Sequence, residues 1–486
     1  MTSNNPEGDG DNKMTDEYNN NIIKPAVQNN PLPTADMPNS TGGCNKEDSG
    51  RASEGNMFNT ATTATAGKEE GIEPHTPSAA PASVIKIDEE AVLDILHPTI
   101  RSWFRQKFSS FTAPQKLAIP LIHEGRSVLV SSSTGSGKTL TAFLSIINEL
   151  FEMAEAGTLQ NTIYCLYISP LKALANDINR NLEVPLREIR TLAKREGRNT
   201  PQIRVAVRSG DTSSTQRQKM AKTPPHIFIT TPESLNIILS TPKFSKNFSD
   251  LRYVIVDEIH ELASSKRGIL LSVALERLEF ELRKPLTRIG LSATQAPITE
   301  IAKFLGGFEK GQPRPINIIE VNNKKTAQLS IISPLPEGNL NEASYLEIND
   351  SIADRLKDII SRHTSTLVFT NTRAMTERMV MKLKKRGLEN VAAHHGSLSK
   401  DIRQDVEAEL KVGNLRATVS STSLELGIDI GSLDLVCQIS SPKSMAKALQ
   451  RIGRAGHTIT GISKGIFIPQ DMDDLVESAA VVRLRR

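Results

Sequence analysis

A loop of small residues reads SSTGSGKT at positions 132–139, between an apolar run, SVLV, and an amphipathic segment, LTAFLSIINEL. Its glycines let backbone N–H groups approach a phosphate chain, and a helix beginning at the lysine adds its positive dipole end. Lys138 can face the β- and γ-phosphates, and the Thr139 hydroxyl is suited to Mg²⁺. The strict pattern has glycine where this chain has Ser132. The residues predicted to bind nucleotide here are Thr134, Gly135, Ser136, Gly137, Lys138 and Thr139.

A pair of carboxylates follows a second apolar run in the string YVIVDEIH. Asp257 is suited to hold Mg²⁺ through water, and Glu258 to polarise an attacking water. Acidic residues also favour the first turn of an ordinary helix, so the pair alone is weak evidence. Together with the phosphate loop, the pair predicts nucleotide hydrolysis, with Thr139 and Asp257 as metal-binding residues.

The roles of two further groups of residues are not evident from the sequence next to them. Arg451 and Arg454, in the string QRIGRAGH, have no carboxylate within four positions, so negative charge must come from another part of the chain. Gln115, in FTAPQKLAI before the phosphate loop, has an amide that can both donate to and accept from the edge of adenine. A lone glutamine is more often a surface residue.

The elements that position these residues form a repeated pattern. Short apolar runs precede amphipathic stretches, as in YCLYIS before LKALANDINRNL, HIFIT before SLNIIL, and TLVFT before AMTERMVMKLKKRG. This alternation predicts an α/β fold in which helices cover both faces of parallel sheets. It pauses around 306–350, where GGFEKGQPRP and PLPEGNLNEA supply breakers. We therefore expect two tandem α/β domains, at 84–325 and 326–486.

Composition separates the first 83 residues from the rest. Residues 1–83 carry 12 acidic and 5 basic side chains, a net charge of −7, whereas the whole chain carries +4. They are rich in polar residues, glycine and proline, so we expect a disordered acidic tail. The remainder is basic, which suits a polyanionic partner. Three scattered cysteines argue against a zinc site or disulfide framework, and no apolar run approaches a membrane span.

Eight motifs together resemble a superfamily 2 helicase. TGSGKT, SPLKAL, TPESL, DEIH, SAT, VFTNTR, STSLELGIDIG and QRIGRAGH occur in that family's order. The longer strings VDEIHELASSKRG and SPKSMAKALQRIGRAGH look most like the Lhr (large helicase-related) proteins of bacteria and archaea. The resemblance covers roughly residues 90–480 and implies two RecA-like (P-loop NTPase) domains that bind ATP and Mg²⁺.

The resemblance also gives the arginines a role. It implies that Arg454 is an arginine finger, that Gln450 couples domain closure to ATP, and that Asp429 contacts the ribose. It supports Gln115 as an adenine contact. Many superfamily 2 members end the last motif in a second arginine, where this chain has His457. A neutral imidazole cannot replace a permanent cation, so whether Arg451 supplies a second finger is open.

Contacts with a nucleic-acid backbone are expected where hydroxyls, prolines and amides follow strands and open helices. Any one of these groups in isolation is more simply a helix cap. A mirrored set in both domains favours contact with a strand. The residues predicted to make it are Ser169, Pro170, Lys172, Thr231, Pro232, Asn371, Thr372, Arg373, Ser421 and Thr422.

The implied activity is that of a monomeric motor on single-stranded DNA, moving 3′→5′ and unwinding DNA or RNA:DNA duplexes. Such a motor would serve DNA repair or genome maintenance in the cytoplasm, at the nucleoid of a prokaryote. Aromatic residues are only 4% of the chain, so base stacking cannot dominate the grip. An RNA helicase, or an ATP-driven clamp without efficient unwinding, is the alternative. Lhr proteins continue into a winged helix, whereas this sequence stops at ESAAVVRLRR, so we expect a fragment or a motor without those modules.

Overall fold

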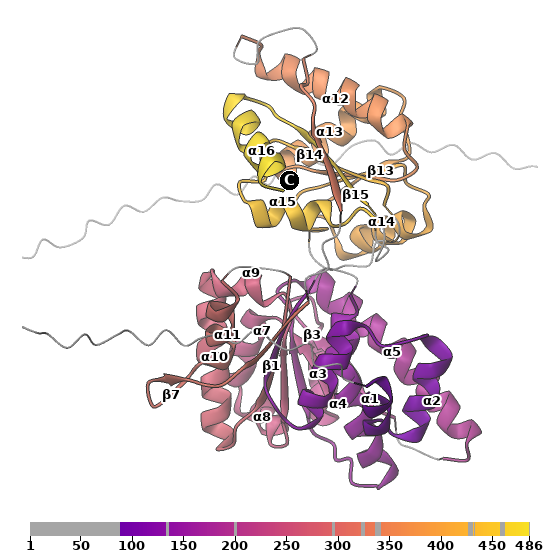
Figure 1. Ribbon diagram of the computed structural model, residues 1–486, viewed down its shortest axis with the longest axis vertical. Coiled ribbons are helices and arrows are strands. Elements are labelled where there is room, and N and C mark those ends of the chain that lie inside the picture. Colours follow the sequence, from indigo (N-terminus) through magenta and orange to yellow (C-terminus); the bar gives the residue numbers. More distant parts are fainter. Residues whose placement is uncertain are drawn as a thin grey trace, which may run out of the picture. The chain divides into compact units, whose positions relative to one another are not determined.

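The computed structural model (Figure 1) describes most of the chain from residue 88 onward, and residues from Pro81 onward belong to one compact unit. The predicted tail lies outside the described residues. So do Thr134, Gly135, Asp429 and His457. The described ranges are 88–132, 136–198, 202–293, 297–321, 326–335, 342–425, 431, 433–456 and 462–485.

The first domain is built on a seven-stranded sheet with strand order β3-β4-β2-β5-β6-β1-β9, and every pairing in it is parallel. Each central strand is fully buried because helices cover both of its faces. The strands are β1 Val128–Ser132, β2 Cys165–Ile168, β3 Val205–Arg208, β4 Ile227–Thr230, β5 Tyr253–Val256, β6 Thr287–Ser292 and β9 Asn317–Val321.

Alternate residues of these strands enter different cores. Val128 and Val130 of β1 pack with the helices before and just after it, whereas Leu129 packs with the later helices. The first group is α1 Glu89–Ile95, α2 Pro98–Lys107, α3 Ala113–His123, α4 Lys138–Glu155 and α5 Lys172–Arg195. The second group is α7 Pro232–Leu239, α8 Pro242–Ser245, the 3₁₀ helix Lys246–Phe248, α9 Ile259–Ala263, α10 Lys266–Leu282 and α11 Ile298–Gly306. Helix α6 Ser214–Lys222 has no buried residue.

The second domain repeats this plan around a six-stranded parallel sheet with strand order β10-β15-β14-β11-β13-β12. One core contains α12 and α13, and the opposite face packs with α14 and the last two helices. The strands are β10 Ala327–Ile331, β11 Thr366–Phe369, β12 Val391–His394, β13 Ala417–Ser420, β14 Leu435–Ile439 and β15 Ser463–Ile468. The helices are α12 Tyr345–Ser361, α13 Arg373–Lys385, α14 Lys400–Val412, α15 Met445–Ile452 and α16 Met472–Arg485.

The predicted α/β class is confirmed, and the quoted strand–helix pairs occur as predicted. The reading of residues 306–350 as a pause was wrong in part, because this stretch contains β9, β10 and the small antiparallel pair β7 Phe308–Glu309 and β8 Gln312–Pro313. Both β9 and β10 are edge strands whose side chains alternate between partly buried and exposed, so no continuous apolar run marks them. The first sheet ends at Val321 and the second begins at Ala327. No described helix combines the length and the apolar character that a membrane span requires.

Gly268 allows α10 to begin directly against the end of α9, the helix that follows the acidic pair. A Cβ atom at Gly268 would lie 2.0 Å from the backbone carbonyl oxygen of Leu262, which cannot move aside as a flexible side chain could. We therefore expect Gly268→Ala to cost about 1–3 kcal/mol of unfolding free energy, in the range of overpacking. Thermal denaturation should show a melting temperature lower by ~2–10 °C.

Gly210→Ala is the matched control, because its Cβ would meet only the mobile end of Lys172, at 3.1 Å. It should melt close to the wild-type protein. Equal melting temperatures for Gly268→Ala and the wild type would contradict the packing described here.

Candidate nucleotide-hydrolysis site

The carboxyl ends of the strands bring the predicted residues of the first domain to one edge of its sheet. Ile168 of β2 pairs with Thr230 of β4 and with Val256 of β5, so the residues after these three strands are neighbours. On the other side of β5, Ser131 of β1 pairs with Ser292 of β6. The phosphate loop, the acidic pair and the strand-contact candidates therefore share one polar edge.

The described part of the phosphate loop has the backbone that the sequence predicted. Gly137 is left-handed, with φ +81°, and α4 begins at the next residue. The Lys138 ammonium donates to the Ser132 carbonyl oxygen at 2.5 Å, across the loop. The hydroxyl oxygens of Ser132 and Ser136 lie 2.7 Å apart. This hydrogen bond gives a physical reason for serine at 132, because it ties the two ends of the loop together.

Gln115 lies against this loop. Its side-chain oxygen accepts from the Thr112 backbone N–H at 2.9 Å, which caps α3, and its amide nitrogen would be 2.9 Å from a Cβ at Gly137. The side chain is buried. Any larger residue at 137 would therefore displace the amide that the sequence analysis assigned to adenine.

Asp257 and Glu258 are both buried, with 6% and 5% of their surface exposed. The Asp257 backbone N–H donates to the carbonyl oxygen of Ile168 at 2.9 Å, which extends the β2–β5 ladder. Glu258 then adopts φ +44°, a left-handed conformation that is rare for a residue with a side chain. Backbone strain of this kind clusters at functional sites, where surrounding structure enforces it.

Burial and the neighbouring Glu258 carboxylate raise the pKa of Asp257 to about 7. Removing a carboxylate from water disfavours its charged form, and a second carboxylate beside it has the same effect. A divalent cation would reverse both effects, because it supplies the positive charge that the pair lacks. Thr139 and Asp257 thus fit the predicted Mg²⁺.

The sequence analysis gave no role to two residues that contact the acidic pair. The Tyr167 hydroxyl, on β2, donates to Asp257 Oδ2 at 2.5 Å. His260 Nδ1 lies 3.7 Å from Glu258 Oε2 and accepts from the Ala293 backbone N–H at 3.4 Å. Burial lowers the pKa of His260, which favours the neutral ring that such an acceptor requires. His260 is the last letter of DEIH and Ala293 belongs to SAT, so their motif membership was the available signal.

The first domain's strand-contact candidates are held by local hydrogen bonds. Ser169 and Thr231 are buried, and their hydroxyls donate to the Leu171 carbonyl oxygen and to the Ser234 hydroxyl. Pro170 and Pro232 are also buried. Thr231 caps α7, the alternative that the sequence left open, whereas Ser169 makes a local turn contact before α5. The exposed group among the five is Lys172.

Arg267 joins the two motifs that contain these candidates. Its guanidinium donates to the Pro170 carbonyl oxygen at 2.7 Å and forms an ion pair with Glu233. The starts of α5 and α7 are thereby held next to each other. Lys172, in turn, lies 2.6 Å from Asp211.

In the second domain the corresponding residues lie at the ends of β11 and β13, where Phe369 pairs with Ser420. Asn371, Thr372 and Arg373 are exposed, as is Thr422, whereas Ser421 is buried. The Asn371 amide donates to the Ser441 carbonyl oxygen at 2.8 Å. This edge therefore presents an amide, hydroxyls and a guanidinium to solvent, as contact with a phosphate backbone requires.

Arg451 has its carboxylate within this domain. The guanidinium forms a buried ion pair with Glu425 at 2.8 Å, donates to Gln438 at 2.7 Å and stacks over the Phe369 ring. Glu425 comes from the STSLELGIDIG motif, 26 residues upstream. The sequence analysis left open whether Arg451 supplies a second finger at the nucleotide, and the structure gives it these protein partners.

Gln450 and Arg454, in the same motif as Arg451, are also buried, at 8% and 1% exposure. Burial lowers the pKa of Arg454, and the carboxylates of Glu258 and Glu425 act in the opposite direction. Among the described residues, neither the oxygen nor the nitrogen of the Gln450 amide has a hydrogen-bond partner. A buried amide of this kind fits a polar ligand.

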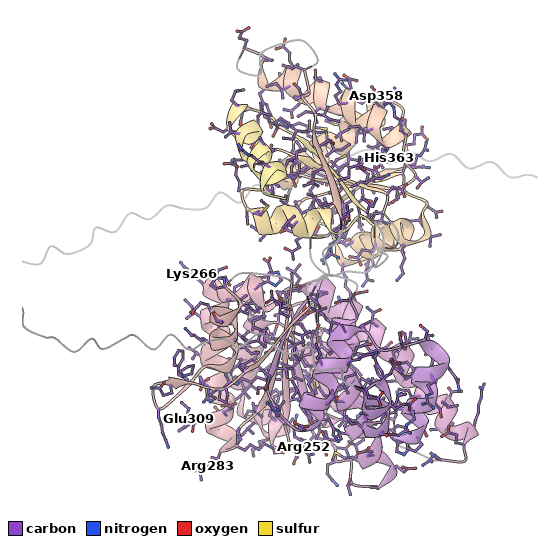
Figure 2. The ribbon with its side chains drawn as sticks, in the orientation of Figure 1. Arg252, Lys266, Arg283, Glu309, Asp358 and His363 are labelled. Carbon is purple, nitrogen blue, oxygen red and sulfur yellow. The ribbon has the colours of Figure 1, made fainter. Side chains whose placement is uncertain are left out.

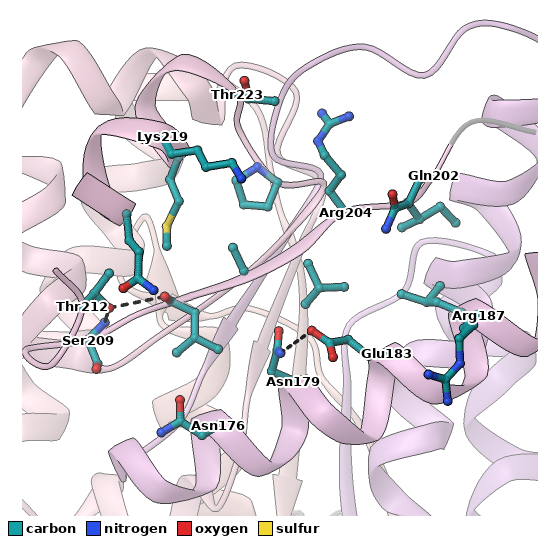
Figure 3. Close-up of a pocket in the computed structure, with 18 of the residues that line it drawn as sticks. Asn176, Asn179, Glu183, Arg187, Gln202, Arg204, Ser209, Thr212, Lys219 and Thr223 are labelled. Carbon is teal, nitrogen blue, oxygen red and sulfur yellow. Dashed lines mark hydrogen bonds between the residues drawn. The ribbon is translucent and has the colours of Figure 1, made fainter. Parts of the chain in front are cut away.

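A separate cavity of about 800 Å³ lies beside the edge strand β3, between α5 and α6 (Figure 3). Arg187, Arg204 and Lys219 contribute to its lining, and Asn179 donates to Glu183 within it at 2.8 Å. The lining contains neither Lys138 nor the acidic pair. It is thus distinct from the nucleotide site.

Apart from the buried Arg288, which pairs with Glu276 and Glu279, the charged residues considered elsewhere in the first domain are on the surface. Arg252, Arg283 and Glu309 project outward in Figure 2, and all three are exposed. The buried charges of the candidate site stand apart from this pattern, since charged groups are rarely buried without partners.

Comparison with known proteins assigns both domains. The DEAD/DEAH box helicase model matches residues 112–302, and the helicase conserved C-terminal domain model matches residues 351–458. The ATP-dependent helicase Lhr-Core of Methanothermobacter thermautotrophicus is 54% identical over 394 residues, covering 80% of this chain and 45% of that protein. The Lhr helicase/uracil glycosylase of Escherichia coli is 37% identical to this chain, and the match covers 80% of this chain and 28% of that protein.

A solved structure agrees. The structure of Mycobacterium smegmatis helicase Lhr bound to ssDNA and AMP-PNP matches with a TM-score of 0.73 and 41% identity, covering 81% of this chain and 50% of that one. The chain spans about half the length, or less, of the curated relatives named here.

The raised pKa of Asp257 predicts a measurable effect on stability. Because the folded pKa of about 7 exceeds the ordinary 3.8, the native state keeps a proton that the unfolded chain releases between those values. The contribution of Asp257 to the free energy of unfolding therefore falls as pH rises from about 4 to about 7. Asp257→Asn removes this dependence and should stabilise the metal-free protein at pH 8 by on the order of 3 kcal/mol, with little effect at pH 4.

Denaturant unfolding at a series of pH values, in metal-free buffer, measures the difference. Asp354→Asn is the control with the opposite sign, since Arg386 lowers the pKa of that carboxyl, so its loss should slightly destabilise the protein at pH 8. An Asp257→Asn protein less stable than wild type at pH 8 would contradict the assignment.

Proposed function

The chain belongs to the Lhr family of superfamily 2 helicases, and from this premise we propose that it is an ATP-dependent motor on single-stranded DNA. The observation that supports this most is the polar edge of the first sheet. There, a phosphate loop follows β1 and a buried pair of carboxylates follows β5, the two strands that flank β6 in the parallel sheet. This arrangement provides phosphate binding and water activation in one place.

The residues of the first domain divide the work. Lys138 exchanges its contact with the Ser132 carbonyl oxygen for the phosphate oxygens of ATP. Glu258 accepts the proton of the attacking water, and the neutral His260 ring lies 3.7 Å from that carboxylate. When bound at Thr139 and Asp257, Mg²⁺ would neutralise phosphate charge. Gln115 would read the adenine edge, beside the loop glycine.

The second domain contributes groups that respond to ATP. Arg454 acts as the arginine finger, and the Glu258 carboxylate already influences its guanidinium. Gln450 couples closure to the nucleotide through its buried amide. Arg451 is bound to Glu425, so in this proposal it supports the helix that presents Arg454 and does not itself touch phosphate.

The grip on the strand comes from exposed polar groups of both domains: Lys172, Asn371, Thr372, Arg373 and Thr422. Phosphate contacts position a strand and carry little sequence information, so binding should be largely independent of sequence. The structure of Mycobacterium smegmatis helicase Lhr bound to ssDNA favours DNA as the track. Movement 3′→5′, unwinding of DNA and RNA:DNA duplexes, action as a monomer and a role in DNA repair complete the proposal.

The test is ATPase activity of the purified chain with ssDNA, with RNA and without nucleic acid, beside strand displacement on 3′-tailed and 5′-tailed duplexes. We expect stimulation by ssDNA and displacement only from 3′ tails. Glu258→Gln is the control that should bind Mg·ATP but hydrolyse it at least 100-fold more slowly, as for loss of a general base. Stimulation by RNA alone would favour an RNA helicase, and stimulation without displacement would favour a clamp. No ATPase activity under any condition would contradict the proposal.

Arg454→Ala should leave ATP binding largely intact, because the phosphate-binding groups lie in the first domain. It should reduce strand-stimulated turnover by roughly 10³–10⁵-fold, since an arginine finger stabilises charge that develops in the transition state. Arg454→Lys should not restore turnover, because an ammonium lacks the planar fork of a guanidinium. The measurements are nucleotide affinity and stimulated turnover for each protein.

Arg386→Ala is the matched control. Arg386 is another arginine of the second domain, paired with Asp350 and Asp354 on the surface. Its loss should leave turnover close to wild type. If Arg454→Ala hydrolyses ATP as fast as the Arg386→Ala protein, the finger has been assigned to the wrong residue.

A further inference from the structure

We propose that Tyr167 is a positioning residue for Asp257: the Tyr167 hydroxyl fixes the Asp257 carboxylate in the orientation that binds Mg²⁺. This inference rests on the proposed ATPase function and names a residue of that site that no motif contains. Tyr167 lies on β2, three residues before Pro170 of SPLKAL, and its side chain is fully buried.

Both oxygens of the Asp257 carboxylate have a defined donor. Oδ2 accepts from the Tyr167 hydroxyl at 2.5 Å, and Oδ1 accepts from the Glu258 backbone N–H at 2.9 Å. The second donor is main chain and cannot be lost by substitution. The Tyr167 hydroxyl belongs to a side chain on a neighbouring strand. Together, the two hydrogen bonds fix the rotation of the carboxylate.

Strand β2 therefore holds Asp257 twice. The Ile168 carbonyl oxygen accepts from the Asp257 backbone N–H at 2.9 Å, while Tyr167, the preceding residue, holds the side chain. Adjacent residues of a strand point to opposite faces, so the tyrosine reaches Asp257 from the face that packs against the earlier helices.

The ring of Tyr167 is held in turn by the helix of the phosphate loop. Phe143 of α4 stacks on it, with ring centroids 5.3 Å apart and an angle of 16° between the planes. Helix α4 begins with Lys138 and Thr139, so a continuous contact runs from the phosphate-binding helix through Phe143 and Tyr167 to Asp257. This chain of contacts thus fixes the relative positions of Thr139 and Asp257, the two residues of the proposed Mg²⁺ site.

The hydroxyl is not required by packing. Cys165, on the same face of the strand, is apolar and fully buried, so an apolar side chain suits this environment. An apolar residue at 167 would leave Asp257 Oδ2 without this donor. Groups that orient metal-binding side chains typically change metal affinity by about 10–100-fold when removed.

Tyr253 offers a matched comparison within the same sheet. It lies on β5, is buried, and its hydroxyl donates to Glu149 Oε2 at 2.5 Å. Glu149 lies near the end of α4 that is remote from Lys138. Tyr253→Phe therefore removes a similar hydrogen bond without touching the acidic pair.

The experiment measures equilibrium binding of a fluorescent AMP-PNP analogue, first in EDTA and then across a Mg²⁺ titration. For Tyr167→Phe we expect unchanged affinity in EDTA and a half-saturating Mg²⁺ concentration raised at least tenfold. Tyr253→Phe should match the wild type in both measurements. Phe143→Leu, which removes the stacked ring, should shift the Mg²⁺ dependence in the same direction by a smaller factor, and it replaces Tyr167→Phe if that protein does not fold.

A double variant separates positioning from general destabilisation. In an Asp257→Asn background the carboxylate is gone, so adding Tyr167→Phe should not change the Mg²⁺ dependence further. Coinciding Mg²⁺ curves for Tyr167→Phe and the wild type would overturn the proposal, as would equal shifts for Tyr167→Phe and Tyr253→Phe. A wild-type protein that binds nucleotide with no Mg²⁺ dependence, or not at all, would instead contradict the proposed ATPase function.

Discussion

The chemistry of the first domain depends on the register of three parallel strands. Because Ile168 pairs with both Thr230 and Val256, the residues after β2, β4 and β5 emerge at one level of the sheet. Parallel strands require a crossover helix, so each strand end also becomes the start of a helix. The strand-contact candidates after β2 and β4 and the acidic pair after β5 are thus brought to one level of the sheet. A shift of one residue in β5 would point Asp257 to the opposite face.

The second domain solves a different physical problem, since it must hold two arginines in its interior. Arg451 is neutralised by Glu425 and further satisfied by Gln438 and the Phe369 ring. Breaking a buried ion pair typically costs more than its formation contributes, because one charge is left uncompensated. The pair therefore serves to fix helix α15 against the motif that contains Glu425. Arg454, one turn after Arg451 in sequence, inherits that fixed position.

The sequence predicted the fold class, the strand–helix units and the motifs well, because buried parallel strands give continuous apolar runs. It missed β9 and β10, whose edge positions leave alternating exposure. The sequence motifs identified Asp257 as a site residue but not Tyr167. The two residues are 90 positions apart, and in the sequence Tyr167 looks like one more apolar position of a strand. Likewise, Arg451 showed no carboxylate within four residues, and its partner Glu425 is 26 residues away. Ser169 and Thr231 are buried, and Thr231 also caps α7, which the motif strings alone do not show.

The contact between Lys138 and the Ser132 carbonyl oxygen bears on how nucleotide exchange proceeds. A desolvated ammonium without a hydrogen-bond acceptor is unfavourable. A lysine that had no other acceptor after losing its phosphate contact would therefore slow product release. Here the carbonyl oxygen accepts the same proton that the phosphate would, and the ammonium passes from one acceptor to the other. The Ser132 carbonyl oxygen thereby competes with the phosphate for the Lys138 ammonium. This competition lowers the affinity for nucleotide and also lowers the barrier to its release. In the proposed motor, each step ends with a departing product, so the rate of product release matters as much as the affinity for nucleotide.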